Sequence, residues 1–152
     1  MRFMMIFKAS EESEAGAMPS EEGLTAMGLV MAEMAEKGVL LAGDGLLSSA
    51  KGFRLQLDGG ERRVVDGPFA ETKELIAGFC LIEVASREEA IEWGWRCMAA
   101  DRGPDGANRG TGLEIRQVAS ADDFGDEFTP EARAREEEAF RKAAENLQKS
   151  NT

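Results

Sequence analysis

Asp66-Gly67-Pro68-Phe69-Ala70-Glu71-Thr72-Lys73-Glu74 is the stretch that decides how the chain is arranged. The apolar pair Val64-Val65 precedes it and is typical of a strand, which we expect to end at Asp66. Gly67 tolerates positive φ, and Pro68 fixes its own φ while disfavouring the α region for the residue before it. The sequence therefore predicts a stiff, sharp corner directly after Asp66.

Apolar patterns on both sides of this corner predict strands. Residues 2–8 contain a short, unbroken apolar run at residues 3–7, which is typical of a central strand covered on both faces. Residues 53–57 alternate apolar and polar side chains, and Gly59-Gly60 predicts a tight hairpin turn to a partner strand over residues 62–65. Further strands are expected over residues 39–41, 76–84 and 113–118.

Capping patterns predict where three helices begin. Ser20 precedes a helix that ends before Gly38, and Ser86 with Glu89 has the spacing of a capping box. Thr129-Pro130 combines an N-cap with proline at the first helical position and opens a charged helix. The segments between these elements are expected to be loops, at residues 9–19, 42–52 and 101–112.

Helical spacing selects the side chains expected in the core. The stripe of the first helix is Leu24, Met27, Met31 and Met34. The stripe of the second helix is expected to be Ile91, Trp95 and Met98. Trp93 and Trp95 are two residues apart and cannot share one face, so Trp93 is expected on the flank, at an interface or a pocket rim.

The composition excludes several classes of function. The chain has 152 residues, of which 43% are hydrophobic and 31% charged, about the size of one soluble domain with its own core. Its net charge of −11 disfavours binding to nucleic acid or to an anionic membrane, which would need clustered Lys and Arg. No apolar run reaches the roughly 20 residues of a membrane span, and no signal peptide follows Met1, so we expect a cytoplasmic protein.

The chain contains no histidine and no tyrosine. Imidazole acid/base catalysis, Ser-His-Asp and Cys-His nucleophiles, and zinc sites built from nitrogen and sulfur are therefore excluded. Cys80 and Cys97 lie within apolar segments and are expected to be reduced core residues. We expect no metal and no cofactor.

The element order β, α, β, hairpin, β, α, β predicts an α+β fold, a ferredoxin-like plait with an inserted hairpin and a charged C-terminal helix. In such a plait the helices cover one face of the sheet. The other face still needs cover, and one solution is a second copy of the chain.

The Asp66-Gly67-Pro68-Phe69 run resembles the signature of the YCII-related family, in the branch named for its DGPF residues. The likeness extends over residues 1–128 and leaves residues 129–152 as a charged helical extension. It implies a dimeric α/β barrel, in which two subunits stack their sheets, and hence a homodimer. Many relatives carry a His-Pro pair where this chain has Leu47-Ser48, so the imidazole half of the His-Asp pairing proposed for the wider group is missing here.

Asp66 is the leading candidate for chemistry. A carboxylate at a strand end, beside apolar Pro68 and Phe69, is expected in a cleft where desolvation raises its pKa and prepares it as a general acid or base. The alternative is structural, because Asp commonly starts a turn by accepting hydrogen bonds from amides two residues further on.

The remaining candidates would bind the substrate. Arg54 and Lys73 are expected to hold the anionic group of a small acidic ligand, although Lys73 has the alternative of an ordinary salt bridge. Asp44 and Ser49 in the glycine-rich segment, and Phe69 at the corner, are the other expected pocket residues, with Ser49 as a neutral hydrogen-bond donor.

Three functions remain open from the sequence. The first is a cofactor-independent isomerase or lyase that uses Asp66 on a small acidic or cyclic organic molecule, in a pocket of the homodimer. The second is a non-catalytic homodimer that binds a metabolite, a regulatory accessory role that the family resemblance implies. The third is a scaffold acting through the charged C-terminal helix.

Overall fold

The computed structural model describes residues 1–102, 105 and 112–150. The chain forms two compact units, Met1–Val118 and Ala119–Thr152. The first unit is built on a four-stranded sheet with the strand order β2-β5-β1-β6. The bounds of these strands are β1 Arg2–Lys8, β2 Leu40–Gly45, β5 Ile76–Glu83 and β6 Leu113–Gln117.

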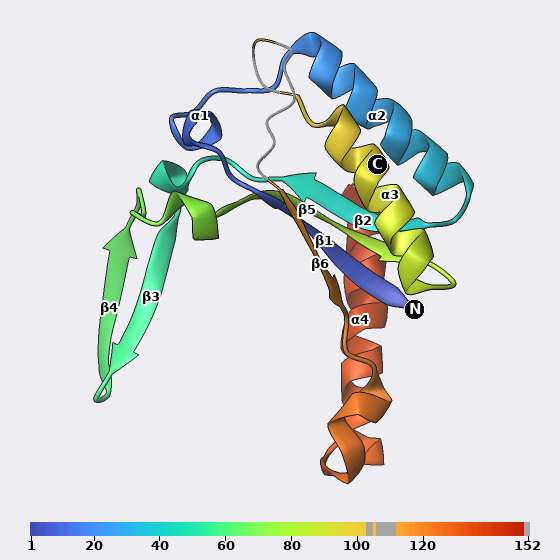
Figure 1. Cartoon of the computed structure of the whole chain (residues 1–152). Coiled ribbons are helices and arrows are strands. Elements are labelled where there is room, and N and C mark those ends of the chain that lie inside the picture. Colours follow the sequence, from blue (N-terminus) through green and yellow to red (C-terminus); the bar gives the residue numbers. More distant parts are fainter. Residues whose placement is uncertain (103–104, 106–111, 151–152) are drawn as a thin grey trace. The chain divides into compact units, whose positions relative to one another are not determined.

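This sheet is antiparallel throughout, with β1 paired to both β5 and β6. The prediction that residues 2–8 form a central strand is therefore confirmed. Helices α2 (Glu21–Glu36) and α3 (Arg87–Ala100) lie next to each other on one face of the sheet (Figure 1). The order β2-β5-β1-β6 is that of a ferredoxin-like plait, so the predicted α+β fold is confirmed.

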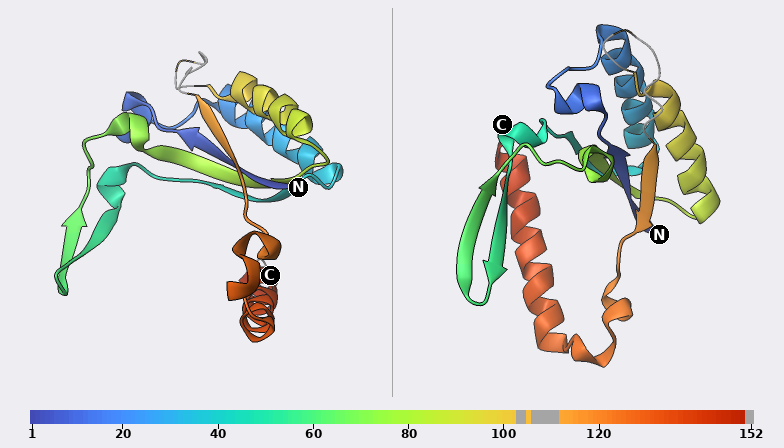
Figure 2. Two further views of the ribbon diagram at one scale, coloured as in Figure 1. Left: turned by 60° about the horizontal axis from the view of Figure 1, so that its bottom comes forward. Right: turned by 60° about the vertical axis from the view of Figure 1, so that its left-hand side comes forward.

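A separate two-stranded sheet is inserted between β2 and β5. It is the hairpin of β3 (Phe53–Asp58) and β4 (Glu61–Asp66), which extends away from the four-stranded sheet (Figures 1 and 2). Gly59 and Gly60 have φ of 55° and 86°, the left-handed conformation that the tight turn needs. Both the hairpin and the end of its second strand at Asp66 are as predicted.

The predicted helix caps are present. The Ser20 hydroxyl accepts a hydrogen bond from the Gly23 amide at 3.1 Å, and the Ser86 hydroxyl accepts one from the Glu89 amide at 3.1 Å. The Glu89 carboxylate accepts from the Ala85 amide at 2.8 Å, one residue before the N-cap. Each cap thus satisfies an amide that the first helical turn leaves without a partner.

Two segments predicted as loops are regular instead. A four-residue helix, α1 (Glu11–Glu14), lies within residues 9–19 and is capped by Ser10 and Ser13. Strand β2 continues through Gly43 to Gly45 because these residues pair with Cys80 and Gly78 of β5. Glycine is unfavourable in an isolated strand, so the pattern alone predicts a loop where pairing in the sheet imposes a strand.

The core lies between the four-stranded sheet and the two helices. Its fully buried side chains are Met5, Met34, Cys80, Ile82 and Cys97. Burying a side chain such as Met or Ile contributes about 1.5–3 kcal/mol. Both cysteines are free and buried, as predicted. Among the described residues, no charged or polar residue is buried.

The predicted core stripe of α3 is wrong. Trp95 is 63% exposed and Trp93 is 6% exposed, while Ile91 and Met98 are half-buried. The helix presents its small residues to the sheet: a Cβ at Gly94 would lie only 2.9 Å from the Ile115 side chain. Reading large apolar residues as the buried face therefore selects the wrong side of this helix. Leu24 of α2, also predicted in the core, is 59% exposed.

Trp93 is covered by cations instead of solvent. The Arg96 guanidinium lies 4.4 Å and the Lys37 ammonium 5.5 Å from its ring centroid. Glu33 forms ion pairs with both, and hydrogen bonds from Arg96 and Lys37 lower the pKa of its carboxyl to about 2. This contribution to stability is present at neutral pH and is lost as the pH falls through about 2.

The second unit is helical. Helix α4 spans Pro130–Ser150, and the Thr129 hydroxyl accepts a hydrogen bond from the Ala132 amide at 3.3 Å, as the predicted cap requires. A short 3-10 helix, Ala121–Glu127, precedes it. The predicted boundary at residue 128 stays a prediction. The predicted loop 101–112 lies mostly outside the described residues. In the part of the chain that the structure describes, no helix combines the length and apolar character needed to cross a membrane.

The two tryptophans provide a test of the α3 orientation. In Trp95→Phe, the remaining Trp93 is expected to emit at short wavelength and to resist quenching by acrylamide. In Trp93→Phe, the remaining Trp95 is expected to emit at long wavelength and to be quenched readily. Steady-state fluorescence of the two variants measures this, and equal quenching in both would contradict the orientation.

Candidate functional site

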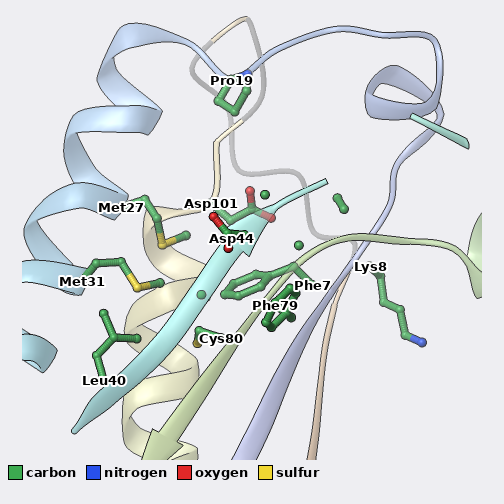
Figure 3. Close-up of a pocket in the computed structure, with 14 residues that line it drawn as sticks. Phe7, Lys8, Pro19, Met27, Met31, Leu40, Asp44, Phe79, Cys80 and Asp101 are labelled. Carbon is green, nitrogen blue, oxygen red and sulfur yellow. The ribbon is translucent and has the colours of Figure 1, made fainter. Parts of the chain in front are cut away.

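The best-enclosed hollow among those lined by described residues lies between α2 and the sheet, with a volume of about 400 Å³ (Figure 3). Helix α2 contributes Met27 and Met31 to its wall, strands β1, β2 and β5 form most of the remainder, and Pro19 and Asp101 lie at its margin. We call this space the α2 cavity. Its volume is within the range of small-molecule sites, about 300–1,000 Å³.

Glycines create this cavity. Gly45 of β2 pairs with Gly78 of β5, which in turn pairs with Phe7 of β1 and, through it, Leu113 of β6, so this row across the sheet has no side chain in its β2 and β5 positions. Gly43, in the next row on the same face, pairs with the buried Cys80. Because Cβ atoms are missing from these positions, the sheet surface below α2 is hollow.

The wall of the cavity is mainly apolar. Met27, Met31, Leu40 and Phe7 supply thioether, aliphatic and aromatic surface. The thiol of Cys80 is the nucleophilic group in the wall, but burial raises its pKa to about 12. The thiol is therefore protonated at neutral pH and is not a reactive nucleophile.

The charged residues that line the cavity are Asp44, Asp101 and Lys8. Asp44 of β2 and Asp101, the C-cap residue of α3, both line it, and Figure 3 draws their carboxyl groups in the part of the view nearer Pro19. Asp44 pairs with Phe79 and lies between Gly43 and Gly45, so its side chain starts from the sheet face opposite α2; it is exposed and lines the cavity only at the open edge along strand β2. The Lys8 side chain points away from Asp44 in Figure 3 and pairs with Glu114 at 2.9 Å.

A second, more open hollow adjoins the α2 cavity at Gly45 and surrounds the predicted corner. Ser49 is its centre: the hydroxyl donates to the Glu14 carboxylate and accepts from the Phe69 amide at 3.0 Å. The Ser49 amide also donates to Glu14, at 3.1 Å. Ser49 and Phe69, both predicted pocket residues, are thus brought together, and their polar groups bind each other.

Gly67 packs directly against the same turn. A Cβ at this position would lie 1.8 Å from the Ser49 carbonyl oxygen, so only glycine fits. The Gly67 amide donates to the Gly52 carbonyl at 2.9 Å, and the Gly67-Pro68 peptide bond is cis. The predicted sharp corner is present and is docked on the 3-10 turn Ser49–Lys51.

The predicted convergence of Asp66, Arg54 and Lys73 on one cleft does not occur within the chain. Asp66 pairs with Phe53 across the hairpin, and Arg54 pairs with Val65, so strand alternation places Asp66 and Arg54 on opposite faces. The Arg54 guanidinium stacks 3.8 Å from the Phe69 ring centroid. Asp66 and Lys73 are both exposed, and neither lines the two hollows described above.

The sequence profile of the YCII-related domain matches residues 1–106. A curated protein of Rhizobium meliloti (strain 1021), "Uncharacterized protein R00369", is 35% identical over 114 residues, which cover 72% of this chain and 86% of that protein. The chain belongs to the YCII-related family.

Among solved structures, the 5-chloro-2-hydroxyhydroquinone dehydrochlorinase TftG from Burkholderia phenoliruptrix AC1100, in complex with 2,5-dihydroxybenzoquinone, is similar to this YCII-related chain. The identity is 12%, the TM-score is 0.39, and the match covers 78% of this chain and 94% of that one. A likeness at this level says nothing of the chemistry of the present chain.

Of the predicted site residues of this YCII-related domain, Asp44 lines the α2 cavity, and Ser49 and Phe69 line the hollow at the corner. The catalytic role of Asp66 and the binding roles of Arg54 and Lys73 stay predictions. Sequence reasoning missed the cavity because it treated residues 43–45 as a loop. The spacing of Gly43 and Gly45, followed by Gly78 in another strand, is the signal that would have indicated a hollow on one sheet face.

The corner of the YCII-related domain is tested by Gly67→Ala. The added methyl group meets backbone atoms of Ser49, so the variant is expected to lose about 3 kcal/mol or more of unfolding free energy. Gly28→Ala is the control, because Gly28 lies in α2 with open space around it and the change is expected to stabilise by about 0.5–1 kcal/mol. Urea unfolding measures both, and equal stabilities would disprove the close packing at Gly67.

Proposed function

We propose that the chain binds a small, uncharged cyclic organic molecule in the α2 cavity. The observation that carries the proposal is the row of glycines, Gly43, Gly45 and Gly78, which leaves about 400 Å³ of mainly apolar space below α2. A cavity of this size with few polar groups is the usual form of a small-molecule site. Membership of the YCII-related family fits this role.

The charges at the cavity select the type of ligand. Asp44, Asp101 and Lys8 line it, and the Lys8 ammonium is already paired with Glu114 at 2.9 Å. Arg54 and Lys73, the residues expected to attract an anion, do not line it. An anionic ligand would approach two carboxylates in a chain of net charge −11. A neutral ring with a hydroxyl or carbonyl group fits better, because its apolar part packs on the Met and Phe side chains and its polar part reaches the rim.

Proton transfer by Asp44 is the second candidate function. The Cys80 thiol remains protonated, and the chain has no histidine, so a carboxylate is the group at this cavity suited to act as an acid or base. This reaction type is that of a cofactor-independent isomerase or lyase. It moves the proposed chemistry from Asp66 to Asp44, since Asp66 is exposed and lines neither of the two hollows described above.

A homodimer remains part of the proposal. Met4, Ile6, Phe79 and Leu81 alternate to the sheet face opposite the buried residues Met5 and Cys80 and form an apolar row there. A second copy stacking its sheet on this row would cover it, as the family resemblance implies. Cytoplasmic localisation likewise stays an expectation.

Filling the cavity tests the binding proposal. Nothing lies within 4 Å of a Cβ at Gly45, so Gly45→Val is expected to fold normally and to occupy the space of the ligand. A thermal-shift screen of neutral rings with their acidic counterparts, such as benzyl alcohol with benzoate, is expected to give hits among the neutral compounds. A ligand at about 100 times its Kd stabilises by about 2.7 kcal/mol.

The control for Gly45→Val is Ala42→Val, a similar gain of volume on the same strand at a position that does not line the cavity. Gly45→Val is expected to abolish the shift for every hit, and Ala42→Val to keep it. The proposal is wrong if both variants keep the shift, or if only anions stabilise the protein.

Turnover of each hit separates binding from catalysis. Asp44→Asn keeps the shape of the side chain and removes its basicity, so an enzyme is expected to lose about 10²–10⁴-fold in rate while still binding the ligand. Asp58→Asn, at the far end of the exposed hairpin, is the matched control. Stabilisation without conversion by the wild-type protein would leave ligand binding as the function and remove the catalytic role.

A further inference from the structure

One face of the β3–β4 hairpin is apolar and uncovered. Phe53, Leu55 and Leu57 of β3 and Val64 of β4 are 65%, 74%, 74% and 64% exposed. The register places them on the same face, because Leu55 pairs with Val64 and residues directly opposite each other share a face. We call this surface the hairpin apolar face. Exposed apolar clusters of this kind usually mark an interaction site.

The hairpin is held to its own chain through its other face. Arg54 stacks on Phe69, and Gly67, directly after β4, bonds to Gly52, directly before β3. These contacts fix the base of the hairpin and leave the apolar face directed away from Arg54. A two-stranded hairpin is marginally stable in water unless its apolar face packs against something. The hairpin apolar face therefore needs a partner.

The hairpin carries equal numbers of basic and acidic side chains, and the two charged residues on its apolar face lie at opposite ends. The hairpin carries Arg54, Arg62 and Arg63 against Asp58, Glu61 and Asp66, in a chain whose net charge is −11. Two of these residues lie on the apolar face itself: Arg62 opposite Leu57 near the turn, and Asp66 opposite Phe53 at the base. They are four residues apart along β4, about 13 Å at the rise of a strand, too far to pair within one chain.

We propose that the hairpin apolar face binds the same face of a second copy of this chain. A two-fold axis lying between the faces and perpendicular to the strands places the base of one hairpin over the turn of the other. Phe53 then contacts Leu57 of the second copy. Leu55 contacts Leu55 of the second copy, and Val64 contacts its Val64. Along β4, Asp66 of each copy faces Arg62 of the other.

The other in-plane two-fold axis, parallel to the strands, is less favourable. It stacks β3 of one copy over β4 of the other, so Phe53 meets Asp66 and Leu57 meets Arg62. Both charges would lose water without gaining a partner, which costs several kcal/mol for each charge. The perpendicular axis is the arrangement in which apolar residues meet apolar residues and each carboxylate meets a guanidinium.

This contact gives Asp66 an interface role and differs from the stacking of the four-stranded sheets. The hairpin is a separate sheet with its own strands. A face six residues long spans about 20 Å. It is therefore smaller than the roughly 800 Å² per partner of a standard interface, and we expect association through it to be weak and dependent on concentration.

Sedimentation velocity over a series of protein concentrations tests the contact. The wild-type protein is expected to show a concentration-dependent association step that Leu55→Glu removes. Gln56→Glu adds the same charge at the neighbouring position on the opposite hairpin face and is expected to keep the step. Circular dichroism and thermal unfolding of each variant establish that it is folded.

Charge reversal tests the register of the two copies. Arg62→Glu alone and Asp66→Arg alone place like charges together, and each is expected to weaken the association step about tenfold or more. The double variant restores opposite charges across the axis and is expected to recover the wild-type affinity. Arg63→Glu, on the opposite face, is the control.

Three results would overturn the proposal. One is a wild-type protein that shows no association step up to its solubility limit. Another is a step that Leu55→Glu leaves unchanged, which would assign association to the four-stranded sheet or to another surface. The third is a double charge variant no better than the single ones, which would exclude the perpendicular two-fold. The proposal does not depend on the ligand in the α2 cavity, so the two can fail separately.

Discussion

The packing of Gly67 against the carbonyl group of Ser49 is the contact on which the rest of the first unit depends. It leaves no room for a side chain, and it joins the end of the hairpin to the turn that follows β2. Ser49 extends the junction to Glu14 through its hydroxyl and to Phe69 through the amide of that residue. This cluster therefore holds the base of the hairpin. It also follows Gly45, the residue of β2 that lines both hollows.

The sequence predicted the fold from strong local signals. The hairpin glycines, the serine caps and the corner at Asp66 each specify backbone conformation within a few residues, and all three are present. The interior of the first unit was less predictable. Trp93 is buried in the core cluster with Arg96 and Lys37 over its ring, and Gly94 brings α3 close to Ile115. Only the three-dimensional packing reveals this orientation of α3.

The candidate site was also predicted only in part, because the position of its side chains depends on packing and strand pairing. Asp44, Ser49 and Phe69 line hollows, since glycine-rich segments and sharp corners often leave space for ligands. Asp66 was predicted from its place at the corner and Arg54 from its place on the polar face of residues 53–57, but strand pairing puts them on opposite faces of the hairpin. The face of a residue depends on register, and in a hairpin the turn fixes the register. The two-residue turn at Gly59-Gly60 pairs Asp58 with Glu61 and therefore Phe53 with Asp66, so the opposite faces of Asp66 and Arg54 could have been derived from the predicted turn.

The cavity also has a consequence for how ligand preference diverges among relatives. A methyl group at Gly43 would meet Cys80 at 2.9 Å, and one at Gly78 would meet the Asp44 carbonyl at 3.0 Å, so those two positions resist change. Gly45 has no such neighbour. A single codon change at Gly45 would therefore trim the space from one side while the backbone stays in place. Under the binding proposal, this residue is therefore the position at which a small side chain changes which molecules fit the α2 cavity.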